Sequence, residues 1–299
     1  MKVPRGAVAP IATRGFGQRM FEAFCLFIVA ICCMVLAWSQ SRSTDLLDFE
    51  SGAVILSVTG EYDVWPALAL LDSDPHTGWA SRRGHVAGNE IVIELPHEYL
   101  LESMVFDNTR AQEIEFPGVS ARAIQIWLST ADAEHGFEMA AEVQATQGGR
   151  ERFPLPLHSR ARWIKLVIGS NWGSDEFTEL MEVAAYGVPV GEVSPPKEVS
   201  GTYLTNFGPL YLEQSGERVR GCYDDGSAMI SGRLDGRVMR LHWRESRSSG
   251  TALLTVSAGG GFINGLWYED NELQGTWRGL RDPGDPRPPC DIDGVAWPE

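Results

Sequence analysis

The chain has 299 residues, a hydrophobic content of 43% and a formal net charge of −15 at pH 7. This length accommodates two ordinary domains, and the apolar content is sufficient for packed cores, which excludes global disorder. An acidic surface repels the phosphates of nucleic acids and of anionic membranes, so neither is an expected partner. Neutral sugars and cations are compatible with this charge, which also keeps a protein soluble without any partner.

Residues 1–40 are predicted to be a signal peptide or a signal anchor. Basic residues precede an uncharged apolar run over 23–38, and acidic residues begin at Asp45. This asymmetry orients the N-terminus towards the cytoplasm and exports the remainder. The run is shorter than the roughly 20 residues of a membrane span. The small residues of Ala37-Trp38-Ser39 suit a signal peptidase. The chain is therefore expected in the cell envelope, on its periplasmic or extracellular face, touching the membrane only through this segment. A polar stalk is predicted over 41–50.

The cysteines allow at most one disulfide in the body of the chain. Three of the five lie in the apolar run, which leaves Cys222 and Cys290 in the body of the chain. No Cys-x-x-Cys occurs, so a zinc or thioredoxin-type site has no support. The two remaining cysteines either form one disulfide, which would stabilise the fold by roughly 4 kcal/mol, or stay as two thiols.

A first domain is predicted over 51–187. Apolar and polar residues alternate over 91–95, 123–129 and 163–168, as in half-buried strands. Clusters of Gly, Pro, Asn and Asp separate these runs, and long helical periodicity is absent. Short strands at this spacing are typical of a β-sandwich or jelly roll.

Five segments of this domain follow one another in a recognisable order. They are the loop Leu71-Asp-Ser-Asp-Pro-His-Thr-Gly-Trp-Ala-Ser81, the strand Glu90–Leu95, the strand Arg162–Ile168, the loop Ser170-Asn-Trp-Gly173 and the ending Glu182-Val-Ala-Ala-Tyr-Gly187. Together they resemble discoidin domains, also called coagulation factor 5/8 type C-like domains. The resemblance implies a galactose-binding-like β-sandwich. Many members of that family bind carbohydrate, and others bind phospholipid head groups or proteins.

The first of these loops is a candidate calcium site. A hard cation takes six to eight oxygen ligands, and the loop supplies Asp72, Asp74 and Thr77 together with backbone carbonyls. The resemblance adds Glu182, which matches a ligating glutamate near the last strand of the family. It implies a structural calcium that ties the first loop to that strand. Ser73 stands where the family usually has glycine. An Asx-turn without metal is the alternative for the same residues.

Carbohydrate binding is the second chemistry that the resemblance implies. Sugar sites combine an aromatic ring for the apolar face of the sugar with polar side chains for its hydroxyl groups. In the family these residues lie on loops near the calcium site. The candidates here are Trp172, Trp65, His76, His85, Asn108 and Arg110. Trp172 is equally compatible with plain packing, whereas Trp79 matches a core tryptophan of the family.

A Pro-rich linker over 188–200 leads to a second domain over 201–280. Four Gly-x-aromatic repeats and closely spaced turn signals predict about eight short strands joined by hairpins. Such an antiparallel meander loses its exposed edges by closing into a small barrel. The start of the domain, 201–208, faintly resembles avidin- or lipocalin-type barrels. Small barrels fill their interiors with side chains, which favours core packing over a pocket for Tyr203, Tyr223, Trp243, Trp267 and Trp277. The tail over 281–299 is predicted to be extended.

The predicted architecture is all-β, and the predicted function is that of a binding protein. No lipase elbow, zincin, Walker or dinucleotide signature occurs, so no catalytic residue is assigned. The first hypothesis is a non-enzymatic exported protein whose discoidin-like domain binds a glycan through its apical loops. The alternative is an envelope adaptor that binds another protein and no sugar. An exposed Trp172 or Trp65 beside polar side chains would favour the glycan hypothesis.

Overall fold

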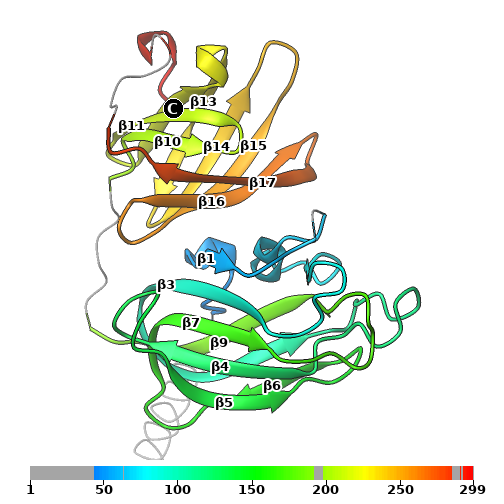
Figure 1. Cartoon of the computed structure of the whole chain (residues 1–299). Coiled ribbons are helices and arrows are strands. Elements are labelled where there is room, and N and C mark those ends of the chain that lie inside the picture. Colours follow the sequence, from blue (N-terminus) through cyan, green and yellow to red (C-terminus); the bar gives the residue numbers. More distant parts are fainter. Residues whose placement is uncertain (1–43, 63, 192–197, 285–289, 291, 299) are drawn as a thin grey trace, which may run out of the picture. The chain divides into compact units, whose positions relative to one another are not determined.

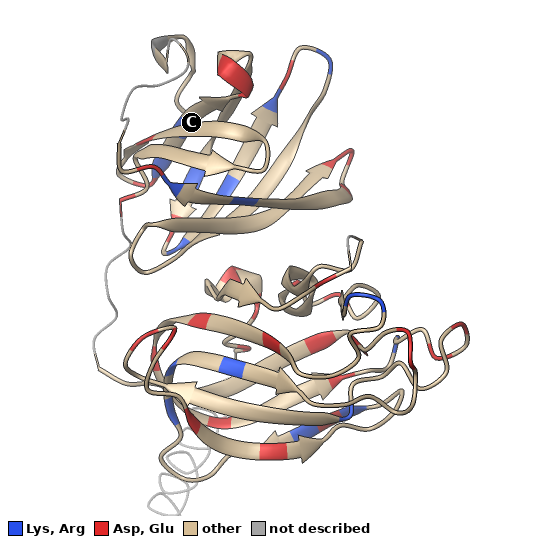
Figure 2. Cartoon of the chain, viewed as in Figure 1, with Lys and Arg blue, Asp and Glu red and all other residues tan. Residues whose placement is uncertain are grey.

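The computed structural model describes residues 44–62, 64–191, 198–284, 290 and 292–298. The predicted signal peptide or anchor over 1–40 lies outside the described residues, as does the middle of the linker. The described residues form a β-sandwich and a closed β-barrel, which confirms the all-β prediction (Figure 1). Their helices are single short turns, and none is long and apolar enough to cross a membrane. In the view of Figure 2, acidic residues are distributed over many strands and turns.

The sandwich is organised around its longest strand, β3 (Asn89–Asp107). The first half of β3 pairs with β1 and β7, and its second half pairs with β6 and β9, so one strand serves both layers. The register shifts between Glu94 and Tyr99, beside Pro96, which has no N–H to donate to a sheet. The other elements are η1 (Phe49–Ser51), β1 (Val54–Val58), η2 (Ala67–Leu71), β2 (Trp79–Ala80), β4 (Ala123–Ser129), β5 (Glu138–Gln144), β6 (Arg150–Pro154), β7 (Arg160–Ile168), β8 (Glu179–Leu180) and β9 (Glu182–Pro189).

Alternation along the strands builds the core of the sandwich. In β4, Ile124, Ile126 and Leu128 are buried, whereas the residues between them are partly exposed. Trp79 is fully buried, and its indole nitrogen donates to the carbonyl of Gly60 at 2.9 Å. Trp79 therefore packs in the core, as the family resemblance implied.

Residues 45–50 differ from the predicted polar stalk. Leu47 and Phe49 lie in the sandwich core, with exposed fractions of 0% and 2%. The amide of Leu46 donates to the carbonyl of Ala185 in β9, and Asp45 accepts from the amide of Ala185, both at 2.9 Å. The acidic residues made this segment look solvent-exposed, but its apolar side chains contribute to the sandwich.

The second domain is a closed barrel of eight antiparallel strands, as predicted (Figure 1). Its elements are β10 (Gly201–Thr205), β11 (Gly208–Ser215), β12 (Arg218–Tyr223), η3 (Asp224–Gly226), β13 (Ala228–Asp235), β14 (Val238–Arg244), β15 (Ser249–Val256), β16 (Phe262–Glu269) and β17 (Glu272–Arg281). Pairing of Tyr203 in β10 with Arg281 in β17 closes it. The repeat glycines have a steric role: a Cβ on Gly221 would lie 2.0 Å from the carbonyl oxygen of Tyr211.

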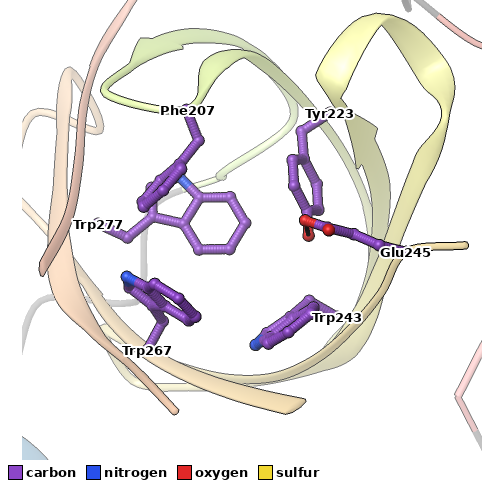
Figure 3. Close-up of a pocket in the computed structure, with 6 residues that line it drawn as sticks. All are labelled: Phe207, Tyr223, Trp243, Glu245, Trp267 and Trp277. Carbon is purple, nitrogen blue, oxygen red and sulfur yellow. Dashed lines mark hydrogen bonds between the residues drawn. The ribbon is translucent and has the colours of Figure 1, made fainter. Parts of the chain in front are cut away.

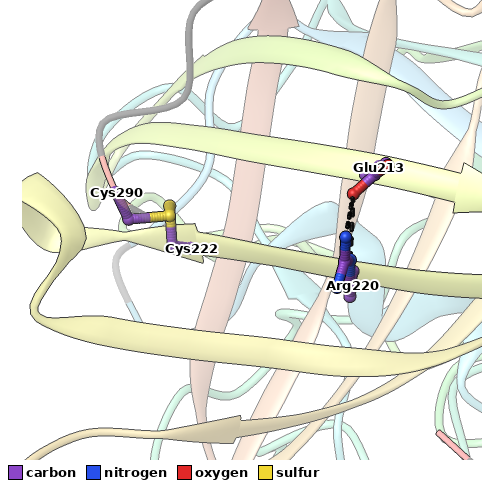
Figure 4. The surroundings of a disulfide bond; sticks show 4 residues. All are labelled: Glu213, Arg220, Cys222 and Cys290. Atoms are coloured by element: carbon purple, nitrogen blue, oxygen red, sulfur yellow. Dashed lines mark hydrogen bonds and ion pairs between the residues drawn. A yellow bond between two sulfur atoms is a disulfide. The ribbon is translucent and has the colours of Figure 1, made fainter. Parts of the chain in front are cut away.

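The described residues of the C-terminal tail, 290 and 292–298, lie against β12. A disulfide joins Cys222 to Cys290 (Figure 4). Further along, Arg220 donates to the carbonyl of Val295 at 2.9 Å, and its guanidinium lies 4.4 Å from the ring centre of Trp297. Arg220 also pairs with Glu213 on β11 at 2.8 Å. The final turn is η4 (Ile292–Gly294).

Residues 45–299 form one compact unit, within which hydrogen bonds join the sandwich to the barrel. The buried guanidinium of Arg237 donates to the carboxylate of Glu94 at 2.9 Å and to the carbonyl of Leu95 at 3.0 Å. Asn264 donates its amide to the carbonyl of Ile55 at 3.1 Å. Leu266 of the barrel belongs to the sandwich core cluster. Polar and apolar contacts thus both connect the two domains.

Candidate functional site

The predicted calcium loop follows η2 and is held by its own hydrogen bonds. The hydroxyl of Thr77 donates to the Asp72 carboxylate at 2.8 Å and to the carbonyl of Asp74 at 2.8 Å. The amide of Asp74 donates to Asp72 Oδ1 at 3.0 Å, which is an Asx-turn. Ser73 adopts a φ of 61°, a left-handed conformation that glycine accommodates more easily. The sequence difference at this position therefore carries a local backbone cost.

Glu182, the first residue of β9, meets Asp72 across the fold. Burial raises the pKa of both carboxyl groups, and the neighbouring charge of Asp72 raises that of Glu182 further. Burial and the neighbouring Asp72 raise the pKa of Glu182 to about 10, and burial raises the pKa of Asp45 to about 6. Glu182 Oε1 is buried and has no hydrogen-bond partner. The pair therefore requires either a bound proton or a cation at neutral pH.

Some of the groups around Asp72 and Glu182 are suitable ligands for a hard cation. Asp72, Glu182 and nearby carbonyls are oxygen ligands, the set that calcium takes, and the unpartnered Oε1 is available for coordination. Asp74 is not directed at the pair, because its exposed carboxylate accepts from the amide and ring of His76. In the part of the chain that the structure describes, no three His, Cys, Asp or Glu side chains form a metal-binding group. Of the four predicted ligands, the structure thus brings Asp72, Thr77 and Glu182 together and directs the carboxylate of Asp74 away from them.

Trp172 lies on a loop rim at one end of the sandwich. Its amide donates to the carbonyl of Gly118 at 2.9 Å, and its indole nitrogen donates to the carbonyl of Ala145 at 3.1 Å. The guanidinium of Arg122 lies 4.7 Å from the ring centre, and its Nε donates to the side chain of Gln144 at 3.0 Å. The side chain remains 39% exposed. Trp172 is therefore both fixed in orientation and open to solvent, beside two polar side chains.

The other predicted sugar contacts are dispersed. Trp65 is half-buried, and His76, His85 and Arg110 are exposed on loops. Asn108 is fully buried, and its amide donates to the carbonyls of Ala121 and Thr146 at 3.0 and 3.1 Å. Its side chain thus ties two loops together and does not face solvent.

Arg122 and Gln144 were absent from the predicted site. Arg122 directly precedes β4 and Gln144 ends β5, so at least β6 and β7 separate each of them in sequence from the Trp172 loop, and no local motif marks them. Only the antiparallel pairing of β4 with β5 and β7 brings these positions to the same edge.

The barrel contains a separate pocket at one of its ends. Phe207, Tyr223, Trp243, Glu245, Trp267 and Trp277 line it (Figure 3). Its empty volume is about 250 Å³, which includes solvent at its mouth. Four of the five aromatic residues predicted as core are therefore lining residues, although Tyr223, Trp243 and Trp277 are also nearly buried. Tyr203 lies elsewhere, with its hydroxyl donating to the carbonyl of Gly260 at 3.2 Å.

The chain is similar in fold to several solved structures. No protein-family model and no curated protein matches the chain. The C-terminal domain of a chitobiase from Bacteroides fragilis is 22% identical, with a TM-score of 0.40, over 47% of this chain and 97% of that one. A putative chitobiase fragment from Bacteroides thetaiotaomicron is 20% identical, with a TM-score of 0.44, over 51% of this chain and 98% of that one. The family 32 carbohydrate-binding module of NanJ from C. perfringens, solved with galactose, is 16% identical, with a TM-score of 0.40, over 48% of this chain and 98% of that one.

These neighbours are galactose-binding-like domains, the class to which the sequence resemblance pointed. Each likeness covers about half of the chain and is one of fold. What the neighbours bind is a property of those proteins.

Proposed function

We propose that this chain is a non-enzymatic, exported glycan-binding protein whose sandwich binds carbohydrate at the Trp172 rim. The observation that carries the proposal is the half-exposed indole, which three contacts hold in place beside Arg122 and Gln144. An indole face covers the apolar side of a sugar ring, while guanidinium and amide groups bond to its hydroxyls. A site that is already ordered avoids the entropic cost of fixing side chains on binding.

A structural calcium completes the proposal. Asp72 and Glu182 would hold the ion together with loop carbonyls, and its charge would replace the proton that the pair otherwise shares. The ion would tie the loop over 72–78 to β9 and would not contact the sugar. Its role is therefore stability of the loop end of the sandwich.

Titration of the purified full-length chain with sugars tests the proposal. Galactose and N-acetylgalactosamine are the first probes, because neighbours of similar fold were solved with galactose and with a GalNAc-galactose disaccharide. Calorimetry should show saturable binding that Trp172→Ala weakens roughly tenfold or more, a typical cost of losing an anchoring aromatic. Trp127→Ala is the matched control, because Trp127 also lies under a cation, Lys165 at 5.6 Å, on the outer face of β4.

Two outcomes would contradict the glycan proposal. One is the absence of binding across a panel of neutral glycans by a chain that melts cooperatively. The other is equal affinity of the wild type and the Trp172→Ala variant. Either outcome would favour the adaptor alternative, in which the same rim contacts an envelope protein.

A further inference from the structure

We propose that the barrel holds a second, independent binding site, which takes a quaternary ammonium group in the pocket of Figure 3. Phe207 lies in the β10–β11 hairpin, and Tyr223 ends β12 at the β12–β13 connection. Trp243 and Glu245 lie where β14 turns into β15, and Trp267 and Trp277 lie on β16 and β17 near their hairpin. The four hairpins share one end of the antiparallel barrel, so the topology gathers these side chains there.

The rings form a cage. Successive neighbours meet edge to face, with ring centres 4.8 to 5.7 Å apart, in the order Tyr223, Trp277, Phe207, Trp267 and Trp243. In Figure 3, Trp277 lies face-on across the back of the pocket, while Tyr223 and Trp243 stand edge-on at its side. The interplanar angle of 70° between Tyr223 and Trp277 agrees with this arrangement. Several electron-rich faces therefore surround one small space.

A single carboxylate closes the remaining gap in the ring. Glu245 lies between Tyr223 and Trp243 and is directed towards the centre (Figure 3). The hydroxyl of Tyr223 donates to its Oε1 at 3.1 Å, and Ser248 donates to its Oε2 at 3.4 Å. Among the described residues, no Lys, Arg or His side chain forms an ion pair with Glu245. Glu245 is exposed at the mouth of the pocket, so neutral donors orient its carboxylate and water hydrates its charge until a cationic ligand binds.

These properties select an organic cation. A cation over aromatic faces is attracted by the ring quadrupoles, and a tetraalkylammonium ion suits such a cage because it needs no hydrogen-bond acceptors. A neutral apolar ligand would remove water from the carboxylate without compensating its charge. A sugar, which needs several polar partners, would find few among the lining residues: Glu245, the Tyr223 hydroxyl and the indole nitrogen of Trp277.

The size of the pocket points to the same class of ligand. The pocket is small and part of its empty volume is open solvent, so the site suits a headgroup and not a drug-sized ligand. Phe207 at the mouth is 39% exposed, so the cage opens to solvent.

Choline and its neutral carbon isostere, 3,3-dimethyl-1-butanol, test the inference on the full chain. Tryptophan fluorescence and calorimetry at constant ionic strength should show saturable binding of choline, with the isostere roughly tenfold weaker or more, as expected for a desolvated cation–π site. Glu245→Gln should weaken choline binding by about the same factor and leave the isostere unaffected. Glu217→Gln, on the β11–β12 turn, is the matched control and should bind choline as the wild type does.

A second variant guards against misfolding of the first. Phe207→Ala removes a partly exposed ring at the mouth, and we expect it to weaken choline binding several-fold at an unchanged melting temperature. Equal binding of choline and the isostere would overturn the inference, as would unchanged choline affinity in folded Glu245→Gln. Absence of saturable choline binding by the folded wild type would identify the cluster as core. Because Trp172 is intact in all these variants, the outcome is separate from that of the sugar titrations.

Discussion

Replacing Glu182 with glutamine is the sharpest perturbation of the buried carboxylate pair. Without a cation the folded chain keeps the Glu182 proton up to a pKa of about 10, whereas the unfolded chain releases it near 4.5. The stabilising contribution of this group is therefore complete below pH 4.5 and is lost as the pH rises towards 10. Between about pH 5.5 and pH 8, at about 1.4 kcal/mol per pH unit, the loss is at most about 3.5 kcal/mol. Solvent screening of the partly exposed group reduces it to about 1–2 kcal/mol.

Urea unfolding followed by tryptophan fluorescence measures this effect. In chelator, the free energy of unfolding of the wild type should fall between those pH values, and that of Glu182→Gln should fall less by about 1–2 kcal/mol. Calcium at about a hundred times its dissociation constant should add about 2.7 kcal/mol to the wild type and nothing to the variant. Glu102→Gln, on the exposed side of β3, is the control and should behave as the wild type does.

The reasoning would be refuted by a variant that loses equal stability in chelator and in calcium. An unchanged pH dependence of Glu182→Gln in chelator would also refute it. In either case the carboxylate would act through packing alone, and neither the proton nor the metal would matter at this position.

Three further stability changes follow from the contacts. Arg237→Met leaves Glu94 buried with less compensation, so urea unfolding should show a loss of about 3 kcal/mol, against less than about 1 kcal/mol for the exposed Arg160→Met. Reducing the Cys222–Cys290 bond should lower the unfolding free energy by about 4 kcal/mol in the same assay, because the bond closes a loop with a sequence separation of 68 residues. Asn108→Ala removes two hydrogen bonds between loops and should lower the thermal midpoint through a loss of about 1–3 kcal/mol. Losses below about 0.5 kcal/mol would contradict each expectation.

The barrel was predictable because its determinants are local. A Gly, Asn or Asp turn between two runs of alternating apolar and polar residues marks each hairpin in the sequence. A sheet made of successive hairpins has two exposed edge strands, and it removes them by closing into a barrel. The same locality made the strand over 123–129 predictable to the residue. By contrast, residues 45–50 contribute apolar side chains to a distant core, and their acidic composition concealed this.

The candidate site was only partly predictable, since it depends on pairing between distant strands. Trp172 stood out as an aromatic in a turn, but Arg122 and Gln144 carry no signal of their own. Asp72 and Glu182 were joined through a family resemblance, not through any local pattern. The barrel aromatics were recognised, but Glu245 was not, and its carboxylate changes the chemistry that the rings offer.

The pairing of β10 with β17 determines when the barrel can close during synthesis of the chain. No closed form exists until residue 281 has been made, because the first strand has to wait for the last as its partner. Cys222 remains a free thiol until Cys290 has been synthesised, because Cys290 is its disulfide partner. A nascent chain that stalls before residue 281 has open strand edges and a free Cys222 thiol at the same time. Oxidation that comes too early therefore threatens this domain more than oxidation that comes late.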